Sequence, residues 1–108
     1  MYIVVFVTVK DLNEAEKIAS QLLEDRLIAC ANISEDVKSI FSWKGQMERS
    51  NEVLLILKSL ESCLPEIVKT VKRLHSYETP EIIALPILDG SADYLNWILE
   101  SCRAPEEK

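Results

Sequence analysis

Hydrophobic positions along the chain fall into apolar runs and alternating stretches that predict strands. Residues 2–8 form a β-branched and aromatic run that is typical of a strand, and residues 28–33 form a second, shorter one. Residues 37–43 alternate with period two, and residues 47–58 return as a further strand. Gly45 between them accepts a positive φ at little cost, so the two segments predict a hairpin.

Helical spacing of apolar residues predicts three helices, each with a start signal. Asp11 caps the first, and Glu14 is expected to be the return half of a capping box. Ser62 is expected to cap the second, with Pro65 in its first turn, and Ser91 to cap the third. The apolar stripes of the helices consist of Ala15, Ile18, Ala19, Leu22 and Leu23, then Leu64, Ile67, Val68, Val71 and Leu74, then Tyr94, Leu95, Trp97, Ile98 and Cys102.

A fourth strand is expected at residues 81–88, where Pro86 requires an edge, a bulge or a bend. The element order is then β-α-β-β-α-β with a final helix, which indicates an α+β, ferredoxin-like sandwich. Residues 1–103 are predicted to form one domain, and residues 104–108 a flexible C-terminal tail.

Three of the strand segments are apolar on both faces, namely residues 3–7, 53–57 and 82–85. Right-handed crossovers place both crossover helices on one side of the sheet, so the other face needs a cover. A large apolar patch is unusual on a monomer, and we therefore expect a homo-oligomer that packs through the sheet. The alternative is that the last helix folds back over this face.

Composition narrows the class of protein further. The chain has 108 residues, a formal net charge of −6 and scattered Lys and Arg, so nucleic acid is not an expected partner. Two glycines are too few for a glycine-rich phosphate loop, and the apolar run at the N-terminus is too short for a membrane span. Three cysteines without a C-x-x-C pair favour a reducing compartment, and we expect a cytoplasmic protein with no membrane partner.

Several segments, in order along nearly the whole chain, resemble the CutA family of divalent-cation tolerance proteins. The segments that carry the resemblance are Leu27–Asn32, Ser39–Gly45, Glu52 with Leu55–Lys58, Leu74–Pro86 and Tyr94–Trp97.

The resemblance implies a ferredoxin-like fold in a tight cytoplasmic homotrimer, with the hairpin around Trp43 reaching a neighbouring subunit. Members are linked to tolerance of copper and other divalent metals, and no enzymatic activity is expected. Their trimers also resemble PII signalling proteins, so a sensor of a small anionic metabolite is the alternative function.

Transition-metal ligands are sparse in this chain. Some members of the family carry a Cys in the first strand and two adjacent His before the Tyr-x-x-Pro segment, and the matching positions here are Val7, Leu74 and His75. His75 is therefore the one candidate imidazole for Cu²⁺ or Zn²⁺, with no obligatory cofactor. The alternative is a histidine at a helix end that forms local hydrogen bonds.

A ligand-binding cleft between subunits is predicted from aromatic, basic and acidic residues near turns and strand ends. Lys58 is a candidate partner for an anion, although a snorkelling or paired lysine is the alternative. A third hypothesis is an enzyme that uses His75 with Glu81 as acid and base. The predicted cleft consists of Trp43, Lys58, His75, Tyr77 and Glu81.

Overall fold

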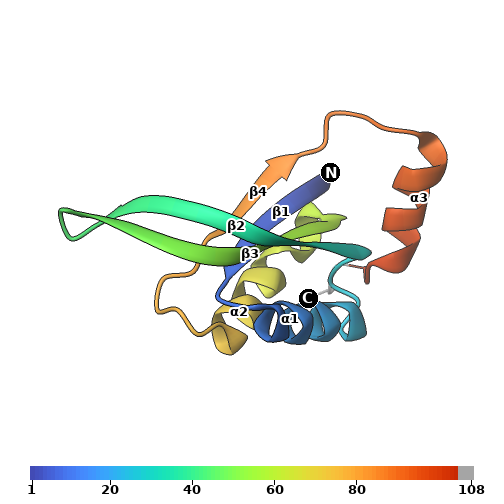
Figure 1. Cartoon of the computed structure of the whole chain (residues 1–108). Helices are drawn as coiled ribbons and strands as arrows, with labels where there is room; N and C mark the ends of the chain where they lie inside the picture. The colour runs from blue at the N-terminus through green and yellow to red at the C-terminus, as the bar shows by residue number, and fades with distance from the viewer. Residues whose placement is uncertain (105–108) are drawn as a thin grey trace.

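Four antiparallel strands form one sheet in the order β2-β3-β1-β4 (Figure 1). The computed structural model describes residues 1–104; of the predicted tail, Ala104 is exposed and residues 105–108 lie outside the described residues. The strands are β1 (Tyr2–Val9), β2 (Cys30–Trp43), β3 (Gln46–Leu60) and β4 (Ile82–Pro86). This arrangement confirms the α+β, ferredoxin-like prediction.

Helices α1 (Leu12–Glu24) and α2 (Leu64–Leu74) lie side by side under one face of the sheet, and α3 (Ala92–Ser101) stands at one end of it (Figure 1). None of the helices within residues 1–104 is long and apolar enough to cross a membrane. The core lies between the sheet and the two lower helices. Its fully buried side chains include Val5, Val7, Leu55 and Leu57 from the sheet and Ile18, Leu22, Ile67 and Val71 from the helices.

Two of the three predicted helix caps are present. The Asp11 carboxylate accepts a hydrogen bond from the Glu14 amide at 2.9 Å, and Ser91 accepts one from the Tyr94 amide at 3.3 Å. The prediction for Ser62 is wrong, because Ser62 lies inside a short 3-10 turn and α2 begins after Cys63, which makes no side-chain cap. Pro65 does lie in the first turn of α2, where its missing N–H costs nothing.

The apolar stripe of α1 ends one residue earlier than expected. Leu23 was predicted to face the core, but its side chain is 45% exposed. A helix advances 100° per residue, so Leu22 takes the last inward position and Leu23 is turned to solvent.

Strand β2 is longer than the sequence pattern predicts. The polar residues Ser34, Glu35 and Asp36 were expected to separate two strands, whereas they form a bulge with Asp36 at φ 61°. The ladder with β3 resumes at Val37, so one strand continues through the irregularity.

Beyond the end of β1, strands β2 and β3 continue as a two-stranded ribbon, which we call the hairpin arm (residues 37–52). The last pair between β1 and β3 is Val9 with Val53, so the arm pairs only with itself and projects from the sheet (Figure 1). Lys44 and Gly45, at φ 51° and 78°, form the predicted turn at its tip.

Strand β4 is shorter than predicted, at Ile82–Pro86 instead of residues 81–88. It pairs only with β1 and is therefore an edge strand, the position that Pro86 requires.

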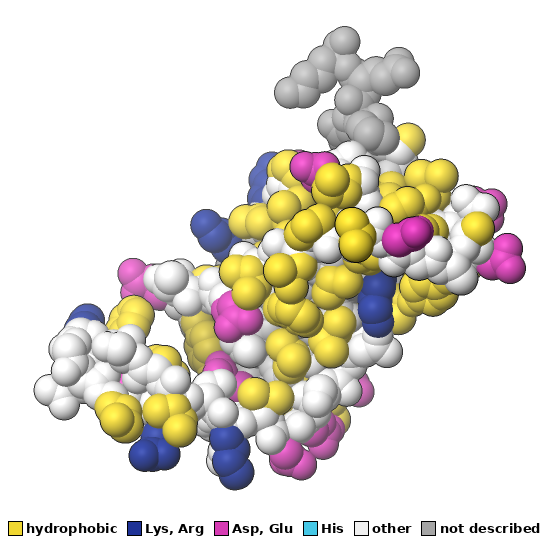
Figure 2. Space-filling view, turned by 90° about the horizontal axis from the view of Figure 1, so that it is seen from above, with side chains coloured by type: hydrophobic (Ala, Val, Ile, Leu, Met, Phe, Trp, Pro, Cys, Tyr) yellow, Lys and Arg dark blue, Asp and Glu magenta, His cyan; other side chains and the backbone are white. Residues whose placement is uncertain are grey.

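The face of the sheet opposite α1 and α2 carries apolar side chains that no helix or strand within residues 1–104 covers, and we call it the open face. Figure 2 looks down on it and shows hydrophobic side chains gathered over the sheet. Ile83 is 52% and Leu85 49% exposed. Helix α3 does not lie across this face in residues 1–104, so the fold-back alternative does not hold (Figure 1). By register the open face consists of Val4, Phe6, Leu54, Ile56, Ile83 and Leu85.

Candidate functional site

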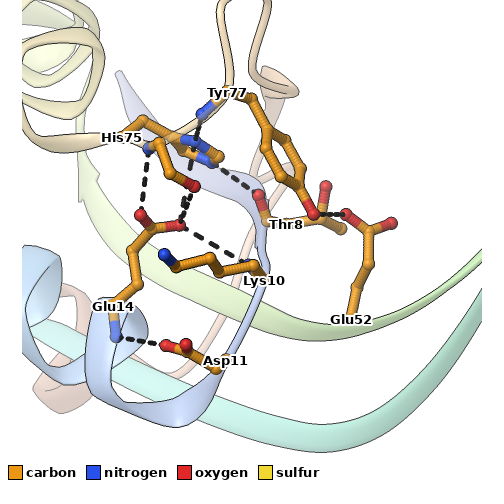
Figure 3. A network of polar contacts seen from close by, with 8 residues as sticks. Thr8, Lys10, Asp11, Glu14, Glu52, His75 and Tyr77 are labelled. Carbon is orange, nitrogen blue, oxygen red and sulfur yellow. Dashed lines mark hydrogen bonds and ion pairs between the residues drawn. The ribbon is translucent and has the colours of Figure 1, made fainter.

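A network of polar contacts lies where the end of β1, the start of α1 and the loop after α2 meet (Figure 3). The loop after α2 supplies His75, Ser76 and Tyr77, because Pro80 and the residue before it disfavour helix and the chain turns back toward β4. Glu14 comes from α1 and Glu52 from β3. The network thus joins segments that lie far apart in the sequence.

Glu14 holds the loop against the first helix. Its buried carboxylate accepts hydrogen bonds from the Ser76 amide at 2.9 Å and the Ser76 hydroxyl at 3.1 Å, with the Lys10 amide at 3.5 Å. The expected return half of the capping box, from Glu14 to the Asp11 amide, is therefore wrong. Three donors in the loop and the β1–α1 junction compensate for the burial of this carboxylate better than one exposed amide would.

His75 is fixed by hydrogen bonds at both ring nitrogens. Nδ1 lies 3.0 Å from the Tyr77 amide, which can only donate, so Nδ1 accepts and the ring proton is on Nε2. Nε2 then donates to the Thr8 carbonyl oxygen at 2.7 Å. The side chain has no exposed surface, and the Glu14 carboxylate is 3.9 Å from Nδ1. This geometry is that of a neutral imidazole that positions the loop.

Tyr77 joins the loop to the base of the hairpin arm. Its hydroxyl donates to Oε2 of Glu52 at 3.0 Å, and its ring packs against His75 with the centroids 4.8 Å apart. Burial raises the pKa of Tyr77, and the hydrogen bond and negative charge of Glu52 raise it further, while a hydrogen bond with Ser50 lowers it. Within residues 1–104, no Lys or Arg nitrogen lies within 4.0 Å of the Glu52 carboxylate, although Glu52 is only 8% exposed.

Of the five residues predicted to line a cleft, only His75 and Tyr77 lie together within a single subunit, as residues 1–104 show. Trp43 lies at the tip of the hairpin arm, and Lys58 bonds to the Asn32 side chain on the sheet. Glu81 is exposed before β4 and, within residues 1–104, makes no side-chain hydrogen bond or ion pair. A cleft formed by all five between subunits stays a prediction, and the acid–base pair of His75 with Glu81 is not assembled.

The residues expected at transition-metal positions do not form a cluster. Val7 is fully buried in the core, and Leu74 packs against the core cluster. Both ring nitrogens of His75 form hydrogen bonds with backbone groups. No group of three or more His, Cys, Asp or Glu side chains in the described part of the chain is placed to hold a metal ion. In this conformation His75 has no free lone pair for a metal.

A shallow hollow of about 300 Å³ lies on the hairpin arm. Lys38 and Arg49 contribute positive charge to its wall. Sequence reasoning did not single out this region, because the two basic residues are on different strands and only the β2–β3 register places them together. The hollow is lined by Lys38, Ser39, Ile40, Arg49, Ser50 and Asn51.

The chain is similar, over nearly its whole length, to known proteins in both sequence and structure. Residues 3–101 match the family described as CutA1 divalent ion tolerance protein. The divalent-cation tolerance protein CutA of Thermus thermophilus is 42% identical over 98 residues, which cover 91% of this chain and 95% of that protein. The chloroplastic protein CutA of Arabidopsis thaliana is 40% identical over 101 residues, 94% of this chain and 56% of that protein, so the chain spans about half the length of that relative. A solved structure of the Thermus thermophilus divalent cation tolerance protein superposes with a TM-score of 0.94 at 41% identity, covering 95% of this chain and all of that one.

Proposed function

Because the chain belongs to the CutA1 divalent ion tolerance family, we propose that it acts in divalent-cation tolerance as a non-catalytic homotrimer in the cytoplasm. The observation that carries the proposal is the open face, on which apolar side chains from three strands are partly exposed and Ile83 and Leu85 of β4 are about half exposed. The three free cysteines support a reducing compartment.

Association follows from the physical cost of leaving the open face in water. Large side chains such as Ile83 and Leu85 are half exposed there, and a patch of several hundred Å² is more than a monomer usually shows. Covering it contributes on the order of 10 kcal/mol before the costs of association are subtracted. The hairpin arm, exposed on both sides, is long enough to reach a neighbour, and the number three comes from the resemblance to CutA proteins.

Sedimentation velocity at micromolar concentration tests the assembly. We expect one species at three times the 12.3 kDa of a single chain. A well-behaved species of 12.3 kDa would contradict the proposal, because the open face would then be stable in water.

The ligand site is proposed to lie at the boundary between subunits, around the Tyr77–Glu52 pair. Glu52 supports this placement, because it is a buried carboxylate without a basic partner in residues 1–104 and its neighbour Tyr77 offers a second oxygen. A divalent cation such as Cu²⁺ or Zn²⁺ would neutralise that charge, and Glu81 of an adjoining subunit is the predicted candidate for a further oxygen ligand. Trp43 and Lys58 would line the cleft without binding the metal. His75 then acts indirectly, by holding the Tyr77 loop.

Calorimetry with Cu²⁺ and with Zn²⁺ separates these roles. We expect Glu52→Gln to abolish most of the binding heat, while Glu16→Gln, an exposed change on α1, leaves it intact. We expect His75→Ala to weaken the binding heat without abolishing it, because His75 holds the Tyr77 loop and is not itself a ligand. A heat equal to that of the wild type would remove His75 from the site altogether. If Glu52→Gln binds like the wild type, the proposed position of the site is wrong.

The hollow on the hairpin arm favours a second candidate function, a PII-like sensor of a small anionic metabolite. Lys38 and Arg49 give the hollow a positive wall, and Lys58 is a separate candidate on the sheet. A ligand that binds the native state raises Tm, so a thermal-shift screen of phosphorylated and carboxylated metabolites tests this function. A shift that is lost in Arg49→Gln and kept in Lys58→Gln would assign the anion to the hollow.

A further inference from the structure

Two of the three cysteines lie together, away from the Tyr77 site, where the end of β3, the start of α2 and the end of α3 meet. Cys63 precedes the first residue of α2 and is 3% exposed. Cys102 follows the last residue of α3 and is 5% exposed. Both belong to the hydrophobic core and both are free thiols.

Each of the two sulfur atoms contacts the segment that carries the other cysteine. The Cys63 thiol lies 3.9 Å from the carbonyl oxygen of Arg103, the residue after Cys102. The Cys102 sulfur lies 3.8 Å from the hydroxyl of Ser59, four residues before Cys63. Burial raises the pKa of Cys102, and a side-chain hydrogen bond with the Cys63 thiol is among the further causes. The two thiols therefore lie close to each other in the core.

Arg26, the second residue after α1, holds the backbone on the Cys102 side. The guanidinium of Arg26 donates to the carbonyl oxygens of Glu100 and Ser101 at 3.2 and 3.3 Å, which caps the last turn of α3. The Arg103 amide in turn donates to the Arg26 carbonyl oxygen at 2.8 Å. These contacts on both sides of Cys102 hold the end of α3 against the segment that follows α1.

We propose that Cys63 and Cys102 form a two-electron redox site that hydrogen peroxide or an organic hydroperoxide converts into an intramolecular disulfide. The Cys63 thiolate attacks the hydroperoxide, the O–O bond breaks, and a sulfenic acid forms on Cys63 as water or an alcohol leaves. The second sulfur attacks the sulfenic sulfur, an S–S bond forms, and the S–O bond breaks with loss of water. The two thiols lose two electrons and two protons in total, and the hydroperoxide accepts them.

The bond would join the start of α2 to the end of α3 and so fix α3 at the end of the sheet. Cys30 takes no part in the reaction, because it lies on β2 beside Asn32 and Tyr94 instead of in this part of the core. It is therefore the natural internal control. The proposal is independent of metal binding, since it requires neither Glu52 nor Tyr77.

The test uses the whole protein, treated with hydrogen peroxide, denatured, alkylated with N-ethylmaleimide and weighed intact. The untreated wild type carries three alkyl groups, and we expect the oxidised wild type to carry one and Cys30→Ser to carry none. Cys63→Ser and Cys102→Ser should each keep both remaining alkyl groups after mild oxidation. Three groups on the oxidised wild type, or a disulfide that involves Cys30 or a second chain, would overturn the proposal.

Because either serine variant can fail to fold, a peptide map of the oxidised wild type provides a second readout. A linked peptide pair containing Cys63 and Cys102 that dithiothreitol separates is the expected result. Its absence from protein that has lost two alkylation sites would equally overturn the assignment.

Discussion

The hydroxyl of Tyr77 lies 3.0 Å from Oε2 of Glu52, and this hydrogen bond ties the loop after α2 to the base of the hairpin arm. The carboxylate is nearly buried, so the phenol replaces part of the hydration that the charge has lost. Because of this contact, Tyr77 should affect both the stability of the fold and the pH dependence of that stability.

Replacing Tyr77 with Phe removes this donor and leaves the carboxylate of Glu52 underpaired. We expect the free energy of unfolding to fall by about 1.5–3 kcal/mol, the range for a hydrogen bond to a charged group. Urea unfolding at pH 7 and a fixed protein concentration measures it, since an oligomer's stability depends on concentration. Tyr94→Phe, at an exposed tyrosine, should cost less than about 0.5 kcal/mol, and equal effects of the two changes would contradict the role of Glu52.

The raised pKa of Tyr77 predicts a specific loss of stability in alkali. The unfolded chain releases the tyrosine proton near pH 10, before the folded protein does, so the free energy of unfolding falls as pH rises through that region. The stabilising effect of Tyr77 is present in full below about pH 10 and is lost as pH rises through the higher pKa of the folded state. The stability gap between the wild type and Tyr77→Phe should therefore narrow between pH 8 and about pH 10, where the unfolded chain loses the tyrosine proton first.

Cys102 and Tyr94 also have raised pKa values, mainly through burial, and they remain in both proteins of this comparison. Their contributions cancel in the difference, so urea midpoints at the two pH values isolate Tyr77. A gap that widens in alkali would mean that the pKa of Tyr77 is lowered in the folded state.

Glu14→Ala should release the loop that carries His75 to Tyr77. The buried carboxylate accepts both Ser76 bonds, and its removal leaves those donors without it, which predicts a loss of about 1.5–3 kcal/mol. Glu16→Ala, two residues along the same helix and exposed, is the matched control and should change stability by less than about 0.5 kcal/mol. Thermal unfolding that ranks the two variants the other way would contradict the role of Glu14.

A charge on the open face should dissociate the assembly. Ile83→Glu places a carboxylate where we propose that another chain packs, and sedimentation should show a shift toward a 12.3 kDa species. Leu23→Glu introduces the same charge at a similarly exposed leucine on α1, at 45% against 52%, and should leave the assembly unchanged. Dissociation by both variants, or by neither, would speak against the open face as the interface.

The order of elements was predictable because it depends on local patterns. Runs such as residues 2–8 and the caps at Asp11 and Ser91 act within one turn or one strand, and the structure confirms them. Ser62 has the residue type of a cap, but the chain enters α2 through a 3-10 turn that the local sequence does not distinguish from a helix start. Ser34 to Asp36 have the composition of a loop, and only pairing with β3 makes them a bulge within one strand.

The candidate site was less predictable because tertiary packing assembles it. Tyr77 was identified from its place beside a turn, but Glu52 and Glu14 owe their environments to segments 25 and 62 residues away. A carboxylate just before the apolar run 53–57 was the one available sign that Glu52 would be buried. His75 was identified as chemically special, yet only the structure shows that Thr8 and Tyr77 occupy its two nitrogens.

The hairpin arm joins the sheet at one end only, so the amide exchange of its residues should be sensitive to contacts with another subunit. A two-stranded ribbon alone in water is marginally stable, so in an isolated chain its backbone amides should exchange with deuterium far sooner than those of β1. In the proposed assembly the arm leans on a neighbour and its exchange slows. Amide exchange rates of residues 38–49, followed across a dilution series, should therefore report the strength of association between subunits.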